Sequence, residues 1–439
     1  MTRDKNERMT AAARAERLRF RWVALVGVLL VGCVESTNAS PSQSRSPEPT
    51  LSSAPTVGVT TSLPIPSLDA TSERFVLPDE FAANLSYVSP DGRFVAARAR
   101  DWGRVVLYRI TKPVPRPPLL ELTPVAEVRG FANQIAWLED SSAVLVGTDL
   151  DPTRTIQNHD PSMQGQRIAM LNIDGHVVIA PETAREIFYH RAHASPDGRW
   201  IWVADRCCVQ QILLLSRDGG QVRKVVPPAP PDVGVGFVGW DRDGLLLYWE
   251  LSGDRSALVA VDVGGAEHYR IPAPSGFRTV FWGVLASAPD RSWQLLELSG
   301  GMGSSFRARR LLVGRELRSV PESLDGSSYG PLAFGNEIVY GGETETTLRA
   351  YQPTSGRIRD LPLRLDLSSG VSTIGISDGY FVWMELITGY VADLETGRRA
   401  ILPLQKTVNV SIVEGARLAE YHSDDNAIVI FDLATIAKR

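Results

Sequence analysis

The sequence predicts an all-β protein, a single β-propeller of four-stranded blades. The first observation is a turn motif that recurs down the chain with an apolar run on each side. The second is another Gly-rich turn that follows many copies of the first. The third is that no helical periodicity is evident after Ser72. Four short antiparallel strands per repeat of about 45 residues is typical of a propeller blade.

The first turn is clearest at Ser89-Pro90-Asp91-Gly92 and at 195–198, which has the same four residues. Pro fixes φ for the second position of a β-turn, Asp suits the third, and Gly tolerates the positive φ of the fourth. Weaker copies lie at 139–141, 241–244, 288–290, 335–336, 377–379 and 414–415. Eight copies predict eight blades, with seven as the alternative if one weak copy does not mark a blade.

The second turn marks the step from the third to the fourth strand of a blade. Its copies lie at 174–175, 218–220, 264–265, 355–356 and 395–397. A short run then ends in an apolar residue and Pro, at 180–181, 226–227, 271–272, 320–321, 361–362 and 402–403. Pro cannot donate to a sheet ladder, so we expect it at the end of the outermost strand.

The two ends of the repeat region predict how the ring closes. The chain stops near 431–433, where earlier blades end their third strand. Residues 74–78 have the apolar-Pro pattern of a fourth strand. We therefore predict that residues 73–78 pair with the three C-terminal strands, which removes an exposed sheet edge.

The Ser-Pro-Asp-Gly copies resemble the repeats of TolB-type, WD-repeat-like bacterial propellers. The similarity covers residues 73 to 437 and is most specific at 89–92 and 195–198. It implies the fold and a bias toward protein binding. TolB has an α/β domain before its propeller where this chain has a tether, so the resemblance does not imply a role in the Tol system. Fold alone does not give function.

The first 32 residues are predicted to be an export signal. Four Arg residues between 14 and 21 precede an apolar run, 22–31, that is too short to span a bilayer. The run ends in Leu30-Val31-Gly32-Cys33, which resembles the lipobox of bacterial lipoproteins. The resemblance implies that Cys33 is acylated and becomes the first residue after cleavage. Residues 33–72 are rich in Ser, Thr and Pro and predict a disordered tether before the propeller at 73–439.

Charge and missing motifs exclude several function classes. The chain has 46 Lys and Arg against 50 Asp and Glu, a net charge of −4. Residues 1–32 hold seven basic and three acidic residues, so the remainder carries −8. An acidic body argues against nucleic-acid binding. No Gly-x-Ser-x-Gly, His-Glu-x-x-His or Gly-Lys-Ser/Thr motif is present, so we expect no cofactor and no metal.

The long loop between the second and third strands of the second blade, 147–166, is the candidate binding loop. It contains Asp149, Asp151, His159 and Asp160, whose spacing matches no known metal site. Long loops in compact domains are often functional, so we expect a partner contact there, with a plain solvated loop as the alternative.

Cys207 and Cys208 are adjacent in the sequence and fall at another loop between the second and third strands of a blade. An oxidising compartment favours a vicinal disulfide between them, whereas the short distance between adjacent Cα atoms opposes it. A reduced pair is the alternative.

These features predict a lipid-anchored, extracytoplasmic, monomeric propeller that acts as a protein- or ligand-binding platform. Its expected partners are the membrane, through the lipid anchor, and a protein of the cell envelope. The alternative is an extracytoplasmic hydrolase or lyase with a carboxylate site on the face formed by the loops between second and third strands and between blades.

Overall fold

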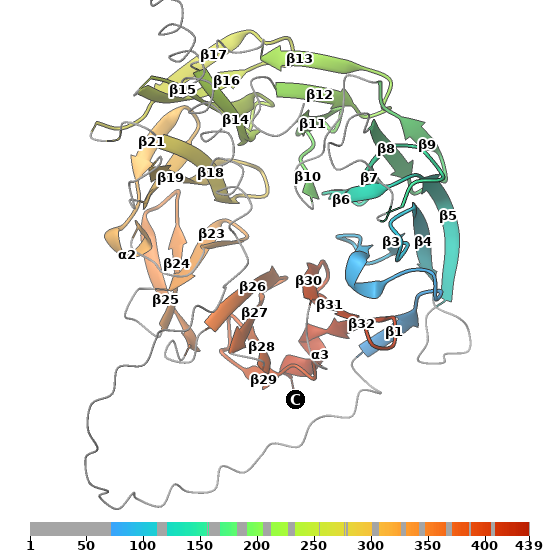
Figure 1. Cartoon of the computed structure of the whole chain (residues 1–439). Coiled ribbons are helices and arrows are strands. Elements are labelled where there is room, and N and C mark those ends of the chain that lie inside the picture. The colour runs from blue at the N-terminus through green and yellow to red at the C-terminus, as the bar shows by residue number, and fades with distance from the viewer. Residues whose placement is uncertain are drawn as a thin grey trace, which may run out of the picture. The chain divides into compact units, whose positions relative to one another are not determined.

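The computed structural model describes residues 72–438 apart from 112–120, 156, 158–166, 182–190, 205–211, 227–232, 254, 276, 278–279, 301–306, 326–330, 342–346, 366–370, 386–387 and 405–408. In this part, the strands form eight sheets arranged as blades around a ring (Figure 1). The predicted all-β propeller of eight blades is confirmed, and the alternative of seven is wrong. No described helix has both the length and the apolar character needed to cross a bilayer.

Each blade runs from its innermost strand a to its outermost strand d. Blade 1 holds β2 (Tyr87–Val88), β3 (Phe94–Arg98), β4 (Arg104–Thr111) and β5 (Glu121–Arg129). Blade 2 holds β6 (Ala132–Leu138), β7 (Ala143–Thr148), β8 (Arg167–Asn172) and β9 (Val177–Ile179). Blade 3 holds β10 (Arg191–Ala192), β11 (Trp200–Ala204), β12 (Ile212–Ser216) and β13 (Val222–Val226). Blade 4 holds β14 (Val233–Trp240), β15 (Leu246–Ser252), β16 (Arg255–Val261) and β17 (Glu267–Pro272).

The second half of the ring repeats this order. Blade 5 holds β18 (Val280–Ser287), β19 (Trp293–Gly300), β20 (Arg307–Val313) and β21 (Glu316–Ser319). Blade 6 holds β22 (Leu332–Phe334), β23 (Glu337–Gly341), β24 (Thr347–Gln352) and β25 (Arg357–Arg364). Blade 7 holds β26 (Val371–Ser377), β27 (Tyr380–Glu385), β28 (Thr388–Asp393) and β29 (Arg399–Ile401). Blade 8 holds β30 (Asn409–Val413), β31 (Arg417–His422), β32 (Ala427–Asp432) and, as strand d, β1 (Ser72–Val76).

Three short helices complete the described elements: η2 (Ala83–Leu85), α2 (Glu322–Asp325) and α3 (Leu433–Ala437). The a–b turns, and the c–d turns of blades 1 to 7, lie at one end of the strands, here called the turn face. The b–c loops and the d–a connections between blades lie at the other end, here called the loop face.

Blade 3 departs from the simple pattern at its innermost strand. β10 pairs in parallel with β6 of blade 2, while Ala194 keeps a single antiparallel bridge to Ile201 of its own blade. All other described strand pairs are antiparallel neighbours within one blade.

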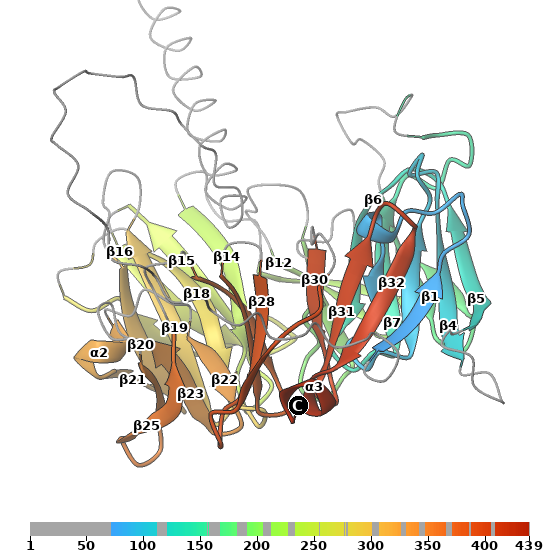
Figure 2. The same cartoon turned by 90° about the horizontal axis from the view of Figure 1, so that it is seen from below.

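The predicted closure of the ring is confirmed. β1 pairs antiparallel with β32, so that Ser72 lies opposite Phe431 and Val76 opposite Ala427 (Figure 2). The side chain of Phe75, on β1, is fully buried in the hydrophobic cluster between blades 8 and 1. The first strand of the propeller therefore supplies the outermost strand of the last blade.

The eight predicted a–b turns all join strands a and b of successive blades. In the first, Gly92 has φ +68 and its N–H donates to Ser89 O at 2.9 Å. The Ser89 hydroxyl donates to Asp91 Oδ1 at 2.6 Å and accepts from Phe94 N at 3.0 Å. The same bonds recur at 195–200, so this short motif closes the hairpin through its own side chains.

One part of the proline prediction is wrong. Pro362 lies inside β25 and does not end it. The register there shifts, because Thr347 pairs with Arg364 while Arg349 pairs with Asp360. Pro362 is tolerated because β25 is the edge strand of its sheet and the residue falls in the resulting bulge, where no ladder bond from its nitrogen is needed.

The hydrophobic core is divided among the junctions between blades. The described residues form eight buried clusters, and each joins two neighbouring blades, including blades 8 and 1. Trp293 and Trp383 are among the largest fully buried side chains. Because burying one large apolar side chain is worth roughly 1.5–3 kcal/mol, every blade is held by both of its neighbours.

Candidate functional site

The loop face of blades 1 and 2 is the best-defined candidate site, here called the blade 1–2 rim: residues 99–104, 129–131 and 149–155. Its backbone is interlocked. Gly130 N donates to Gly103 O at 2.9 Å, and Ala132 N donates to Trp102 O at 2.8 Å. Phe131 N donates to Asp149 Oδ1 at 2.9 Å. These bonds fix three loops from two blades against one another.

Asp149 and Asp151 of the candidate binding loop are brought into this rim. Asp149 Oδ1 also accepts from Asp151 N at 3.0 Å, and Arg154 Nε lies 3.7 Å from Asp149 Oδ2 and 3.4 Å from Asp151 Oδ2. Hydrogen bonds from the backbone and hydroxyl of Thr153 lower the pKa of Asp151. These two carboxylates therefore hold the loop in shape.

The other two residues of the candidate loop, His159 and Asp160, lie outside the described residues, as do Cys33, Cys207 and Cys208. Within the described ranges, no group of three or more His, Cys, Asp or Glu side chains could hold a metal ion.

A hollow of about 530 Å³ with several charged lining residues lies at the rim. Its charged lining comes from the loop before β2 and from blade 1: Glu80, Arg100, Asp101, Arg104 and Arg129. Arg104 Nη2 donates to Glu80 Oε1 at 2.9 Å, and Arg100 Nε donates to a backbone oxygen, that of Asp79. The hollow offers guanidinium donors and carboxylate acceptors already held in place by their partners.

On the inner side of the rim, Arg98 is a buried guanidinium, 5% exposed. Its Nη1 donates to Ala132 O at 3.4 Å and Asn133 O at 3.2 Å, and its carbon Cζ lies 4.1 Å from the ring centroid of Trp102. Its Nε has no hydrogen-bond partner, and no described carboxylate forms an ion pair with it. Burial lowers the pKa of Arg98 below its usual value.

Trp102 is held in an unusual backbone conformation, with φ +64. Its indole stacks on Phe131 with the ring centroids 5.7 Å apart and the planes 14° apart. A bulky residue at positive φ is costly and persists only where its surroundings demand it. Here the Trp102 indole lies between the guanidinium of Arg98 and the ring of Phe131, and these contacts hold the backbone of Trp102 at positive φ.

Sequence reasoning missed Arg98 and Trp102, although one signal for Arg98 exists. Phe94 and Ala96 face blade 2, so the strand period of two puts Arg98 on the same buried face. A charge at an inward position of an apolar strand is the feature that could have identified it.

His193 lies near the turn face, between β10 and the a–b turn of blade 3. Its Nδ1 is 3.2 Å from Glu139 Oε1. Arg291 of blade 5 reaches the same group, with Nη2 3.7 Å from Glu139 Oε2 and donating to Ala194 O at 3.4 Å. These contacts link the turns of blades 2, 3 and 5 and do not form a metal site.

The polar loop at 421–426 is a structural tie. Asn426, at φ +54, accepts from Ala83 N through Oδ1 and donates from Nδ2 to Leu77 O and Pro78 O. His422 Nε2 lies 2.8 Å from the buried Glu420. The bonds of Asn426 could not be predicted from the sequence, because its partners lie more than 340 residues away along the chain.

No protein-family model matches the chain, and no curated protein matches it in sequence. Solved structures match in fold. Porphyromonas gingivalis dipeptidyl peptidase 4 aligns with TM-score 0.52 and 12% identity, over 76% of this chain and 55% of the peptidase. Oligogalacturonate lyase from Vibrio parahaemolyticus aligns with TM-score 0.47 and 13% identity, over 83% and 98% of the two chains.

The β-propeller domain of Cps50 (Swd1) from Myceliophteria thermophila aligns with TM-score 0.38 and 15% identity, over 81% of this chain and 97% of that domain. The propeller fold itself is established by the eight sheets of this structure. At these identities the likeness concerns the fold alone.

Proposed function

We propose that this protein is a lipid-anchored, extracytoplasmic binding platform, and that the blade 1–2 rim is its binding face. The anchor follows from the basic residues, the apolar run and Cys33 in the order of a lipoprotein signal. Lipidation at Cys33 tethers the propeller to the membrane through residues 34–71. The partner is a protein or ligand of the cell envelope, and the propeller works as a monomer.

The observation that carries the binding role is the interlocked rim, with its hollow of charged lining residues. Gly103, Phe131 and Asp149 fix the loops before a partner arrives, so little ordering entropy is lost on binding. The hollow presents Arg100 and Arg129, and Arg98 adds a buried positive charge with no ion-pair partner among the described carboxylates. This arrangement suits a partner with polar and acidic groups.

The alternative of a hydrolase or lyase needs two carboxylates that converge on a substrate. The described carboxylates of the rim serve other bonds: Glu80 pairs with Arg104, Asp101 accepts from Gly103 N, and Asp149 and Asp151 hold their own loop. No specific observation therefore favours the enzyme.

A photo-cross-linking amino acid placed at position 129 or at position 199 tests the binding face in cells. The two sites are matched, because both arginines are exposed and each pairs with an acidic residue two positions earlier in the sequence. Arg129 pairs with Glu127, and Arg199 pairs with Asp197. Arg129 lies on the rim and Arg199 on the turn face. We expect a specific cross-linked product from position 129 alone. Equal products from both sites, or none from position 129, would contradict the assignment.

A further inference from the structure

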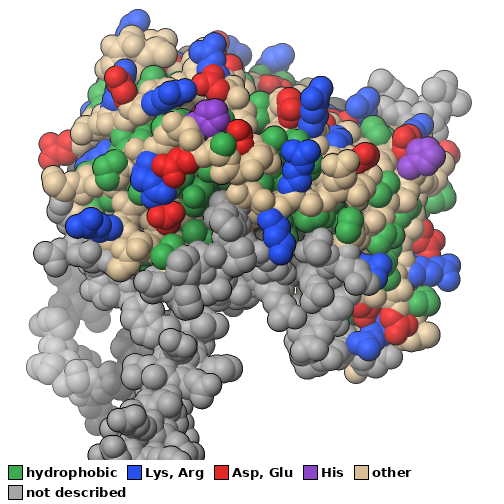
Figure 3. Space-filling model, turned by 90° about the horizontal axis from the view of Figure 1, so that it is seen from above, with side chains coloured by type: hydrophobic (Ala, Val, Ile, Leu, Met, Phe, Trp, Pro, Cys, Tyr) green, Lys and Arg blue, Asp and Glu red, His purple; other side chains and the backbone are tan. Residues whose placement is uncertain are grey.

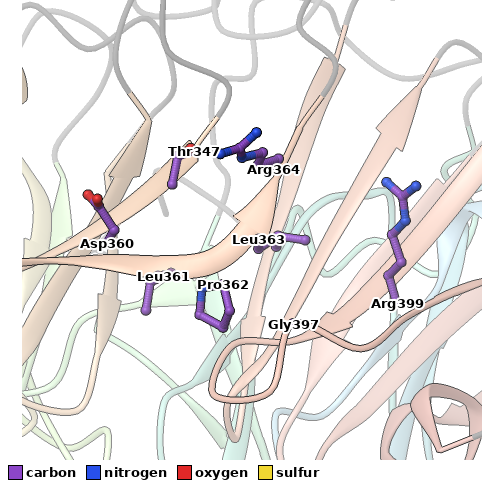
Figure 4. A pocket seen from close by; sticks show the side chains of 8 residues that line it. All are labelled: Thr347, Asp360, Leu361, Pro362, Leu363, Arg364, Gly397 and Arg399. Carbon is purple, nitrogen blue, oxygen red and sulfur yellow. The ribbon is translucent and has the colours of Figure 1, made fainter.

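A second hollow lies on the outer wall of the ring, between β25 of blade 6 and β29 of blade 7 (Figure 4). It encloses about 530 Å³ and is here called the blade 6–7 groove. The residues that matter for its chemistry are Thr347, Asp360, Pro362, Arg364, Gly397 and Arg399. None of them belongs to the blade 1–2 rim.

The groove lies at the bulge in β25. Leu361, Pro362 and Leu363 together oppose the single Leu348 on β24. Both leucines of the bulge are buried, whereas Pro362 is exposed toward the groove. A bulge bends its strand and ends regular pairing, so this stretch of the wall is shaped differently from a continuous edge strand.

Two guanidinium groups at the groove have no charge partner among the described residues. Arg364 and Arg399 are exposed, and neither forms an ion pair or side-chain hydrogen bond with the part of the chain that the structure describes. The nearby Asp360 is already paired with Arg349 Nε at 3.1 Å. By contrast, acidic and basic side chains are interspersed over the wall seen in Figure 3. The groove is thus a positive site on a body whose net charge is −8.

The edge of the neighbouring strand, β29, pairs with no described strand on its outer side. β29 has only three residues, and it is the outermost strand of its sheet. Ala400 packs toward blade 8, so the strand period turns Arg399 and Ile401 toward blade 6 and the groove. Ile401 is 44% exposed there. An edge of this kind offers backbone donors and acceptors to an added strand.

We propose that the blade 6–7 groove binds an extended, acidic segment of a partner protein, which adds to the edge of β29 and places carboxylates on Arg364 and Arg399. Carboxylates match the fork of the guanidinium group. An apolar residue of the segment covers Ile401. The open backbone of β29 favours a polypeptide, because a lipid headgroup makes no use of a row of peptide groups.

A short fluorescein-labelled peptide of alternating Glu and Val is the probe, and its anisotropy with the intact protein is the measurement. We expect the double variant Arg364→Gln with Arg399→Gln to raise the Kd for the peptide by about tenfold or more. The matched control, Arg357→Gln with Arg398→Gln, removes two exposed charges from the same blades outside the groove and leaves Kd within about twofold. The same peptide with Gln in place of Glu binds weakly to every variant.

Thermal unfolding confirms that both double variants are folded. Vesicles containing phosphatidylglycerol form a separate arm. The proposal is overturned if the peptide does not bind, if both double variants weaken it equally, or if only the vesicles depend on Arg364 and Arg399. None of these outcomes bears on cross-linking at the blade 1–2 rim, so the two proposals fail independently.

Discussion

Two glycines in the c–d turns of blades 6 and 7 allow the close contact between these blades to be tested by adding one methyl group, as a Gly→Ala substitution. Gly356 and Gly397 both have φ +70. A Cβ built on Gly356 meets nothing within 4 Å, whereas one built on Gly397 overlaps the carbonyl oxygen of Pro362 and lies 2.9 Å from its carbonyl carbon. Substitution by Ala therefore adds the same backbone strain at both positions, but a steric clash at only one.

The expected magnitudes follow from this comparison. An L-residue in the left-handed region costs about 1–2 kcal/mol, and Ala reduces the entropy of the unfolded chain equally at the two sites. The clash adds about 1–3 kcal/mol, typical of an overpacked site. Pro362 cannot yield freely, because Leu361 and Leu363 beside it are buried. Gly397→Ala should thus be less stable than Gly356→Ala by about 1–3 kcal/mol.

Urea unfolding followed by Trp fluorescence gives both free energies of unfolding, and their difference removes the shared backbone term. Hydrogen exchange provides a local check, because only Gly397→Ala should speed exchange in β29. If the two variants lose the same stability, Gly397 does not determine how closely blade 7 approaches blade 6, and the reasoning is refuted.

Three further predictions concern closure, pH and anchoring. Phe75→Ala should lower the free energy of unfolding by about 3–5 kcal/mol, because Phe75 is fully buried at the closing strand. The control Val76→Ala should lower it far less, because Val76 is 46% exposed. Similar losses for the two variants would contradict the closure role. Burial opposes ionisation of Asp91, but hydrogen bonds from Ser89 and Arg93 outweigh it and lower its pKa. The stabilisation by ionised Asp91 is therefore present above the unfolded pKa of about 3.9 and is lost as pH falls through the lower folded pKa. The difference in free energy of unfolding between wild type and Asp91→Asn should thus shrink in acid. A difference that stays constant in urea titrations from neutral to acid pH would count against this. Cys33→Ala should move the protein from the detergent to the aqueous phase in phase partitioning or block its maturation, and unchanged partitioning would exclude the anchor.

The parts of the fold that could be predicted from sequence are those set by local chemistry. Ser89, Asp91 and Gly92 bond to one another and to Arg93 and Phe94 just after them, so the local motif predicts the hairpin. The closing strand was predictable because β1 repeats the apolar-Pro pattern of the other d strands. Repetition supplied the rest of the architecture.

The features that could not be predicted depend on partners distant in sequence. The bulge at Pro362 and the pairing of β10 with β6 arise from neighbouring strands whose register the sequence does not give. Arg98 and Asn426 act through backbone oxygens, which every residue has, so their side chains carry no complementary motif. Asp149 was predicted to lie in a partner-binding loop, and its bonds from Phe131 N and Asp151 N could not be predicted because they depend on how that loop packs against the next blade connection.

The direction in which the chain enters the ring bears on the proposed platform. Ser72 pairs with Phe431, at the end of β32 that precedes α3, whereas Val76 pairs with Ala427, next to the b–c loop of blade 8. β1 therefore begins on the turn face and runs toward the loop face. A lipid at Cys33, as proposed, is connected to the propeller at the turn face, while the blade 1–2 rim lies on the opposite one. The strand that closes the ring therefore begins, at Ser72, on the face opposite the proposed binding rim.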